Sequence, residues 1–160
     1  MTWFINYVLP YFSDDDLTKI ELHIVGKNPN EQIKGIHDGK SIFIHGWVNS
    51  LENIMQSTDL VIVPILSGSG TRIKIIESAC NGKAILSTSM GAQGSGLTSD
   101  KNIVIKDEPE DFYNTIMSLS CDYSQIEELS DAAYKYAIDN YSLEHVTELK
   151  RRIYDDLINN

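Results

Sequence analysis

The sequence predicts a single three-layer α/β domain, with a mainly parallel sheet between two layers of helices. Short apolar runs rich in β-branched residues alternate with segments whose apolar residues recur at helical spacing. The 160 residues can build one substantial core, and no repeat or low-complexity linker divides them. A doubly wound sheet of this kind binds ligands at the carboxyl ends of its strands, so residues that follow the strands are the first candidates for a site.

Apolar runs predict the strands, and most are closed by a residue that ends or bends a strand. Gly26 and Gly46 close the first two, and Pro64 breaks the third. The fourth leads into residues 89–96, which contain three glycines and are expected to form a flexible loop. His23 lies inside the first strand, where a packed or edge position is favoured over a catalytic one. The predicted strands are 20–25, 41–45, 60–65, 84–87 and 102–106.

Segments with helical spacing fill the intervals between the strands and both ends of the chain. At the start, Trp3, Phe4, Tyr7, Val8 and Tyr11 form an apolar stripe that needs a partner surface. The predicted helices are 3–12, 32–37, 51–56, 71–80, 108–119, 124–140 and 142–157. The residues of the last helix that are expected to face inward are Leu143, Val146, Leu149, Ile153 and Leu157. The helices within 124–158 belong to the same domain, which spans residues 1–160.

Composition narrows the classes of function. The net charge of −10 argues against a nucleic-acid surface. The two cysteines, Cys80 and Cys121, give neither a disulfide framework nor metal-ligand spacing, which favours a reducing, cytoplasmic compartment. Cys80 sits on an apolar helical stripe and is expected in the core. No apolar run approaches the ~18 residues of a membrane span, and no His, Cys or paired-carboxylate cluster predicts a metal.

Residues 59–82 carry the strongest functional signal, because they read as strand, glycine loop and helix. Gly68 and Gly70 allow a backbone to approach a ligand closely. The first N–H groups of the following helix carry partial positive charge. Arg72 and Lys74 add full positive charges in the first turn. Such a site suits a phosphate or a diphosphate.

Three stretches, at 68–79, 81–88 and 91–94, also resemble a known family. Gly-Ser-Gly-Thr-Arg-Ile-Lys-Ile-Ile-Glu-Ser-Ala, then Asn-Gly-Lys-Ala-Ile-Leu-Ser-Thr and Gly-Ala-Gln-Gly, resemble the donor-nucleotide site of family 4 retaining glycosyltransferases of the GT-B fold. The resemblance implies a Rossmann-like donor-binding domain that holds a nucleoside-diphosphate sugar and serves, for example, in polysaccharide biosynthesis. It implies no metal and no other cofactor.

The resemblance also assigns roles to residues. In the family, the glutamate at the position of Glu77 binds the ribose hydroxyls; the other interpretation of Glu77 is a surface ion pair with Lys74. Ser69 stands where the family usually has a second glutamate that meets the donor sugar, as in a Gly-x-Gly-Thr-Arg variant. The catalytic candidates are Arg72 and Lys74, which would stabilise the leaving diphosphate. The donor-binding candidates are Gly26, Gly46, Gly68, Ser69, Gly70, Thr71, Glu77 and Gly91. Trp47 would either stack on the base or cover a helix.

The resemblance further implies that an N-terminal acceptor domain and the first strand of the donor domain are missing, so that the chain alone transfers no sugar. Other interpretations are a non-catalytic nucleotide-binding or interaction module, or part of a nucleotide-sugar epimerase. Without the first strand, the strands at 20–25 and 60–65 would each leave a row of backbone groups unpaired, which is costly when buried. We therefore expect them to pair directly, or to borrow a strand from another chain, with residues 3–11 packed over the junction.

Overall fold

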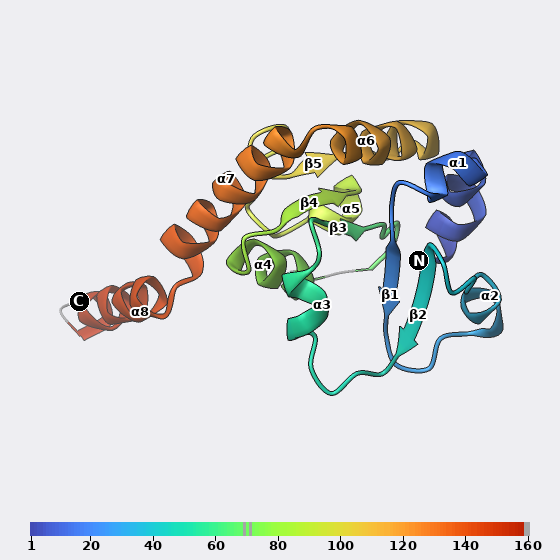
Figure 1. Cartoon of the computed structure of the whole chain (residues 1–160). Helices are drawn as coiled ribbons and strands as arrows, with labels where there is room; N and C mark the ends of the chain where they lie inside the picture. The colour runs from blue at the N-terminus through green and yellow to red at the C-terminus, as the bar shows by residue number, and fades with distance from the viewer. Residues whose placement is uncertain (69, 71, 159–160) are drawn as a thin grey trace.

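The computed structural model describes residues 1–68, 70 and 72–158. Strands and helices alternate along the chain, as expected for an α/β domain (Figure 1). The strands are β1 (Leu22–Val25), β2 (Ile42–Gly46), β3 (Leu60–Val63), β4 (Ala84–Ser87) and β5 (Val104–Ile105). The helices are η1 (Phe4–Val8), η2 (Leu9–Tyr11), α1 (Asp14–Leu17), α2 (Glu31–Lys34), α3 (Glu52–Gln56), α4 (Ile73–Cys80), α5 (Ser89–Ala92), α6 (Pro109–Cys121), α7 (Tyr123–Tyr141) and α8 (Leu143–Ile158).

Within the described part of the chain, the strands form two separate parallel sheets. One contains β1 and β2, with Leu22 opposite Ile42, and the other has the order β3-β4-β5. The α/β class and the parallel pairing are confirmed. The expected direct pairing of β1 with β3 is wrong, because the two strands belong to different sheets (Figure 1). Each of them instead borders the same large cavity, which is described below.

The three-stranded sheet is covered on both faces. Ile85 of β4 packs with Ile75 and Ala79 of α4 and with Ala133 of α7. Its neighbour Leu86 points to the opposite face and packs against α6 and η1, in the cluster that contains Phe112, Ile116, Phe4 and Val8. Successive side chains of a strand point to opposite faces, so a β4 in which all four residues are buried fits a strand covered on both sides. This half of the molecule has the expected three layers.

The N-terminal segment packs across the two sheets. The rings of Phe4 and Phe112 lie 6.1 Å apart, and those of Trp3 and Phe112 lie 5.5 Å apart. The same cluster includes Leu22 of β1 and Leu60 of β3, so the segment lies over the junction as expected. The predicted stripe is wrong at Tyr7 and Tyr11, which are exposed. The segment is a π-helix followed by a 3₁₀-helix, and its twist therefore differs from that of the α-helix assumed in the prediction.

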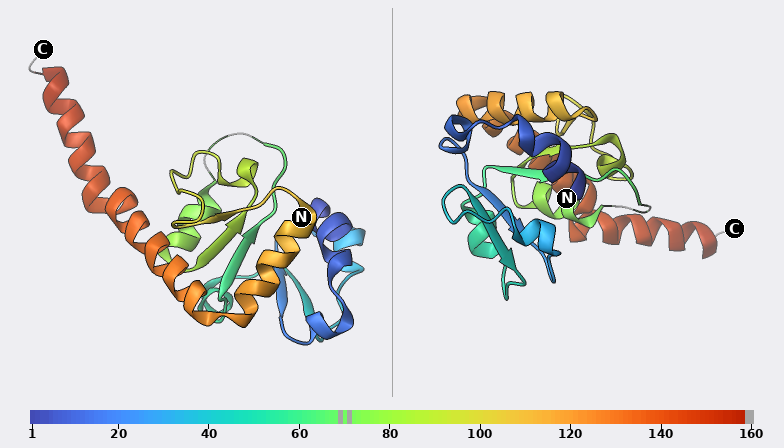
Figure 2. Two further views of the ribbon diagram at one scale, coloured as in Figure 1. Left: turned by 90° about the horizontal axis from the view of Figure 1, so that it is seen from above. Right: turned by 90° about the vertical axis from the view of Figure 1, so that its right-hand side faces the viewer.

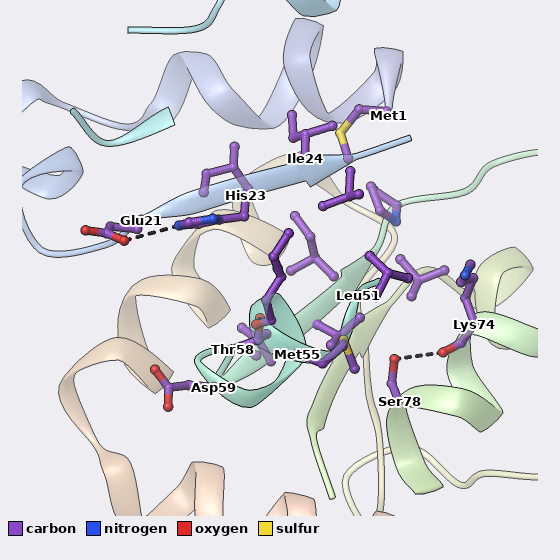
Figure 3. Close-up of a pocket in the computed structure, with 18 of the residues that line it drawn as sticks. Met1, Glu21, His23, Ile24, Leu51, Met55, Thr58, Asp59, Lys74 and Ser78 are labelled. Carbon is purple, nitrogen blue, oxygen red and sulfur yellow. Dashed lines mark hydrogen bonds and ion pairs between the residues drawn. The ribbon is translucent and has the colours of Figure 1, made fainter. Parts of the chain in front are cut away.

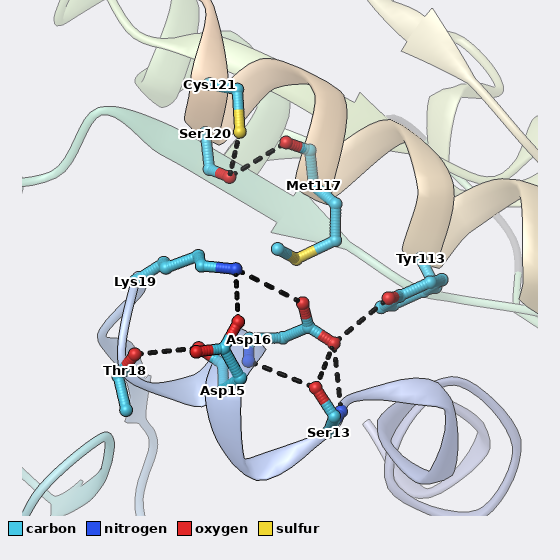
Figure 4. A network of polar contacts seen from close by, with 9 residues as sticks. All are labelled: Ser13, Asp15, Asp16, Thr18, Lys19, Tyr113, Met117, Ser120 and Cys121. Carbon is cyan, nitrogen blue, oxygen red and sulfur yellow. Dashed lines mark hydrogen bonds and ion pairs between the residues drawn. The ribbon is translucent and has the colours of Figure 1, made fainter.

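The helix α1 was missed by the sequence analysis, although a capping box marks its start. Asp16 N donates to Ser13 Oγ at 3.2 Å, and Ser13 N donates to Asp16 Oδ2 at 3.0 Å. Tyr113 of α6 donates its hydroxyl to Asp16 at 3.1 Å (Figure 4). Hydrogen bonds from Ser13 and Tyr113 lower the pKa of Asp16, and burial with the Asp16 contact raises the pKa of Tyr113. This network fixes the N-terminal segment to α6.

Two expectations about buried helix faces are wrong. Cys80 is exposed, because the face of α4 that meets α7 carries Ile75, Ser78 and Ala79. The residues of α8 predicted to face inward lie in a helix without a buried residue, and Leu143 is 82% exposed. Figure 2 shows the cause, since α8 projects away from the body of the molecule in both views.

Candidate functional site

The candidate site lies at the carboxyl ends of β1, β2 and β3. A cavity of about 1600 Å³ opens between the two sheets (Figure 3). Its lining includes the predicted site residues Gly26, Gly46, Arg72, Lys74 and Glu77, which are separated by up to 51 positions (77 − 26) in the chain. The structure therefore brings together residues from the ends of two strands and from the first turns of α4.

Gly26 and Gly46 lie side by side at the end of the two-stranded sheet. Gly26 N donates to Gly46 O at 2.9 Å, which extends the β1–β2 ladder by one bond. Gly46 has φ +63°, a conformation that a residue with a side chain adopts only with strain. Trp47 follows it and is 67% exposed beside the cavity, so its ring does not cover a helix in this structure.

Asp38 fixes the turn that leads into β2. Its carboxylate accepts hydrogen bonds from the N–H groups of Ile42 at 2.7 Å, Lys40 at 2.8 Å and Ser41 at 2.9 Å. These donors stabilise the charged form and lower the pKa of Asp38 to about 2. The turn sets the start of β2 and thereby helps to place Gly46 at its end.

Gly68, in the glycine loop that follows β3, lies against the side chain of Arg72. Gly68 has φ +131°, and a Cβ built on it would lie 2.8 Å from a guanidinium nitrogen of Arg72. The arginine side chain therefore occupies the space that a side chain at position 68 would need. Gly70 also has a positive φ, at +84°. The predicted donor-binding residues Ser69 and Thr71 lie outside the described residues.

The start of α4 carries two positive side chains. The first helical hydrogen bonds run from Ile75 N and Ile76 N to Arg72 O, so the N–H groups of Ile73 and Lys74 precede them at the positive end of the helix dipole. Lys74 Nζ lies 3.1 Å from Glu77 Oε2, and both side chains are exposed. The ion pair that the sequence offered as the alternative for Glu77 is therefore present in the structure.

A set of buried hydrogen bonds joins the end of β4 to the end of β3, from which the glycine loop departs. The sequence analysis missed these bonds. Ser87 Oγ donates to Val63 O at 3.1 Å, and Thr88 Oγ1 donates to Ile65 O. Gly91 N in turn donates to Thr88 Oγ1 at 3.0 Å. A Cβ on Gly91 would lie 2.7 Å from Val63 O, so this glycine packs against the end of β3. Because the partners are 23 and 24 residues apart, short-range patterns in the sequence give no sign of them.

Charged side chains of both signs line the cavity. Among the residues that the structure describes, no three His, Cys, Asp or Glu side chains are grouped to hold a metal ion. The charged residues that line the cavity near the carboxyl ends of the strands include Lys27, Arg72, Lys74 and Glu77. This arrangement suits an anion with a neighbouring hydroxyl-bearing group.

Parallel strands whose ends converge on a cationic helix start define an α/β domain of the Rossmann-like class. Comparison with known proteins shows the family to which this domain belongs. A family model described as glycosyl transferases group 1 matches residues 1–122. The chain therefore belongs to the glycosyl transferases group 1 family, and the resemblance identified in the sequence is confirmed at this level.

A relative from Klebsiella pneumoniae, an uncharacterized 44.6 kDa protein in the cps region, is 27% identical over 154 residues. The match covers 91% of this chain and 39% of the relative, so the chain spans well under half the length of that protein.

Solved structures show the same fold at low identity. Anabaena Alr3699/HepE in complex with UDP is 15% identical with a TM-score of 0.76, and the match covers 100% of this chain and 45% of HepE. A glycosyltransferase from Rickettsia africae is 19% identical with a TM-score of 0.71 over 88% of this chain and 41% of its own. The C-terminal domain of LpcC from Francisella tularensis is 17% identical with a TM-score of 0.58, over 71% of this chain and 60% of its own. The Rossmann-like fold is confirmed. Within the described part of the chain, no helix is both long and apolar enough to cross a membrane.

Proposed function

We propose that residues 1–160 form the donor-binding half of a retaining glycosyltransferase, which transfers a sugar from a nucleoside-diphosphate sugar to an acceptor. The observation that carries the proposal is convergence: in a chain of the group 1 family, Gly26, Gly46, Arg72, Lys74 and Glu77 line one cavity at the carboxyl ends of the strands. The acceptor would be held by an N-terminal domain outside these residues, and the reaction would take place in the cytoplasm, where the free thiols of Cys80 and Cys121 are stable.

The diphosphate would sit against the glycine loop and the start of α4. Backbone N–H groups from the loop, including those of Ser69, Gly70 and Thr71, would donate to its oxygens. The leaving diphosphate gains negative charge as the bond to the sugar breaks. Arg72 and Lys74 would stabilise this charge, in the way that fixed donors stabilise an oxyanion.

Glu77 would exchange its partner when the donor binds. Both side chains of its ion pair with Lys74 are exposed. Exposed pairs of this kind contribute about 0–1 kcal/mol to stability. Hydrogen bonds from two ribose hydroxyls to a carboxylate are charge-assisted and stronger. Opening the pair therefore costs little, and it frees Lys74 for the phosphates and Glu77 for the ribose.

Trp47 would meet the base. Its indole is largely exposed at the mouth of the cavity, next to the Gly26–Gly46 end of the two-stranded sheet. The HepE structures contain UDP or UDP-glucose, so these are the first ligands to test with this chain, alongside other nucleoside diphosphates.

The ribose role is tested by Glu77→Ala in the 160-residue chain. We expect calorimetry to show weaker nucleoside diphosphate binding by about 1.5–3 kcal/mol, because a hydrogen bond to a charged group is lost. The matched control is Glu31→Ala, which removes a comparable exposed ion pair, to Lys34 at 2.7 Å, from outside the cavity lining. If both variants bind as tightly as the unchanged chain, Glu77 is only a partner of Lys74.

Transfer by the 160-residue chain provides a separate test. We expect no sugar transfer to any added acceptor, because these residues hold only one side of the cleft and cannot position the acceptor at the donor carbon. Slow hydrolysis of the donor is compatible with this expectation. Detection of a glycosylated acceptor by mass spectrometry would contradict it.

A further inference from the structure

Three of the four histidines in the chain gather around the carboxyl half of β2. His23 of β1 and His45 of β2 are joined through their rings, and His37 contacts β2 from the segment that follows α2. Phe43 lies between the two groups, because its ring is 4.9 Å from that of His23 and 6.3 Å from that of His37. These rings form one cluster, and the proposed function uses none of its histidines.

Hydrogen bonds show where the protons of the His23–His45 pair lie. His23 Nε2 lies 3.1 Å from Glu21 Oε2 (Figure 3), and a carboxylate only accepts, so this nitrogen carries a proton. In the neutral ring, His23 Nδ1 then has a lone pair. His45 Nε2 lies 2.9 Å from it and therefore donates. The ring centroids are 5.1 Å apart, so both nitrogens lie close to the line between the centroids, and the hydrogen bond lies near the plane of both rings.

His37 holds the opposite edge of β2. The strand β1 occupies one edge of β2, and the other edge has no neighbouring strand among the described residues. On that edge, Ile44 N donates to His37 Nδ1 at 3.2 Å. This nitrogen must therefore have a lone pair, as in a neutral imidazole that carries its proton on Nε2.

A β-bulge brings His45 into the cluster. The register of the sheet passes from Ile24 opposite Ile44 directly to Val25 opposite Gly46, so His45 is an extra residue on β2. A bulge interrupts the ladder of backbone bonds and re-aims a side chain. The bond between the two imidazoles therefore joins the strands at the place where their ladder is interrupted.

Each of these bonds needs an acceptor ring that is neutral. A histidine that takes up a proton carries N–H groups on both nitrogens and accepts no longer. His37 thus loses the bond from Ile44 with its first added proton. The His23–His45 pair keeps its bond when His45 takes up one proton, but a second would leave two N–H groups facing each other across 2.9 Å. Histidines change charge between about pH 5 and pH 8, so mild acid removes these bonds.

Several charged groups surround the three rings. Glu21 is bonded to His23 and can balance its added charge. Asp38 is adjacent to His37 in the chain, and three backbone N–H groups lower its pKa to about 2. Asp38 therefore stays charged in mild acid, and the turn that it holds is unchanged there. His23 also lines the cavity, where the other charged residues include Lys19, Lys27, Glu52, Asp59, Arg72, Lys74 and Glu77.

We propose that the three clustered histidines form a pH-sensitive switch at the carboxyl end of the two-stranded sheet. Near neutral pH, their lone pairs hold Ile44 and the bulge at His45 in place. In mild acid these bonds are lost, and the end of β2, with Gly46 and Trp47, loosens while the three-stranded sheet keeps its structure. The inference does not depend on the proposed donor site, although Gly46 lies at the edge of that site.

Amide hydrogen exchange of the 160-residue chain tests the switch, measured as protection relative to the unfolded chain. From about pH 7.5 to about pH 5, we expect protection to fall about tenfold at Ile44 and Gly26, whose N–H groups donate on either side of the bulged end of β2. The internal controls are Leu22, which donates to Ser41 O at the other end of the same sheet, and Ile85 in β4. Their protection should change less than about twofold.

Asparagine variants separate the loss of a lone pair from other effects of acid. The side-chain oxygen of asparagine accepts a hydrogen bond as histidine Nδ1 does, and it takes up no proton in this range. The double variant His23→Asn/His37→Asn should therefore keep, at about pH 5, the protection that the unchanged chain loses. The matched control is His145→Asn in α8, which should retain the full pH dependence. Protection at Ile85 shows that each variant is folded.

Three results would overturn the inference. The first is protection at Ile44 and Gly26 that is the same at both pH values in the unchanged chain. The second is a pH dependence in the double variant as large as in the unchanged chain. The third is an equal loss of protection at Leu22 and Ile85, because acid would then unfold the chain as a whole. If the double variant fails to protect Ile85, the single variant His37→Asn, measured at Ile44, decides in the same way.

Discussion

The two sheets differ sharply in how they are covered. In the three-stranded sheet, β4 has a strand on each side and helices on both faces, and Ile85 and Leu86 are completely buried. In the two-stranded sheet, Ile24 and Ile42 are the buried hydrophobic residues among those described, and His23 and His45 are exposed on the other face. Parallel strands are stable when both faces are covered. The comparison indicates that the most completely buried part of this chain lies around β4.

The candidate site draws on both halves. Gly26 and Gly46 end the two-stranded sheet, whereas Arg72 and Glu77 belong to the loop and helix packed on the three-stranded one. Local opening in proteins starts where buried apolar contacts are few. A ligand that bridges the two halves would therefore stabilise the β1–β2 side more than the β4 side.

The largest expected effect compares one substitution in the two halves. Phe112→Ala should lower the free energy of unfolding by about 3–5 kcal/mol, because a fully buried ring leaves a cavity between η1 and β4. Phe43→Ala in β2 should cost about 1 kcal/mol, because that side chain is only partly buried. Denaturant unfolding measures both. Equal losses would contradict the difference between the halves.

An intermediate effect is expected at the support of the glycine loop. Thr88→Val keeps the shape of the side chain but leaves Ile65 O and Gly91 N without their hydrogen bonds, at a cost of about 1–3 kcal/mol. The control is Thr115→Val on the exposed side of α6, which should change stability by less than about 0.5 kcal/mol. Thermal unfolding compares the two, and a Thr88→Ser variant should recover most of the loss. A Thr88→Val chain as stable as the control would show that the buried bonds do not hold the loop.

The smallest effect concerns the turn before β2. The pKa of Asp38 is about 2 in the folded chain, below the value of about 3.9 for an unperturbed aspartate. A lowered folded-state pKa stabilises the fold above pH ~4, and this contribution is lost as the pH falls from ~4 toward ~2. Asp38→Asn should therefore be less stable than the unchanged chain at pH 6, and the difference should shrink at pH 2.5. A difference in unfolding midpoint that is independent of pH would contradict this origin.

Local sequence patterns predicted most elements, because each depends on nearby residues. The end of the predicted helix 71–80, which is also the end of α4 at Cys80, and the alternation of strands and helices are examples. Periodicity identifies an apolar face but not its partner, which is why α8 and Cys80 were placed wrongly. Residues 89–96 were expected to be a flexible loop, yet they contain α5 and the buried Gly91, because Thr88 caps that helix.

The candidate site, like the fold, was predicted where it depends on one local segment and missed where it depends on contacts between distant segments. The positions of Arg72, Lys74 and Glu77 follow from one strand–loop–helix segment, and a motif within one segment can be recognised from sequence. The bonds from Ser87 and Thr88 to β3 join segments far apart in the chain, and no local pattern signals them. The gap between β1 and β3 was missed as well, since strand pairing depends on which other strands are available.

The projecting helix α8 has a consequence for how the molecule moves through solution. Its 16 residues make a rod about 24 Å long at 1.5 Å per residue. A compact domain of 160 residues has a radius of gyration of only about 15 Å. The rod therefore increases hydrodynamic drag far more than it increases mass, so the monomer should diffuse slowly and elute early from a sizing column. Column elution alone would therefore overestimate the mass of a monomer.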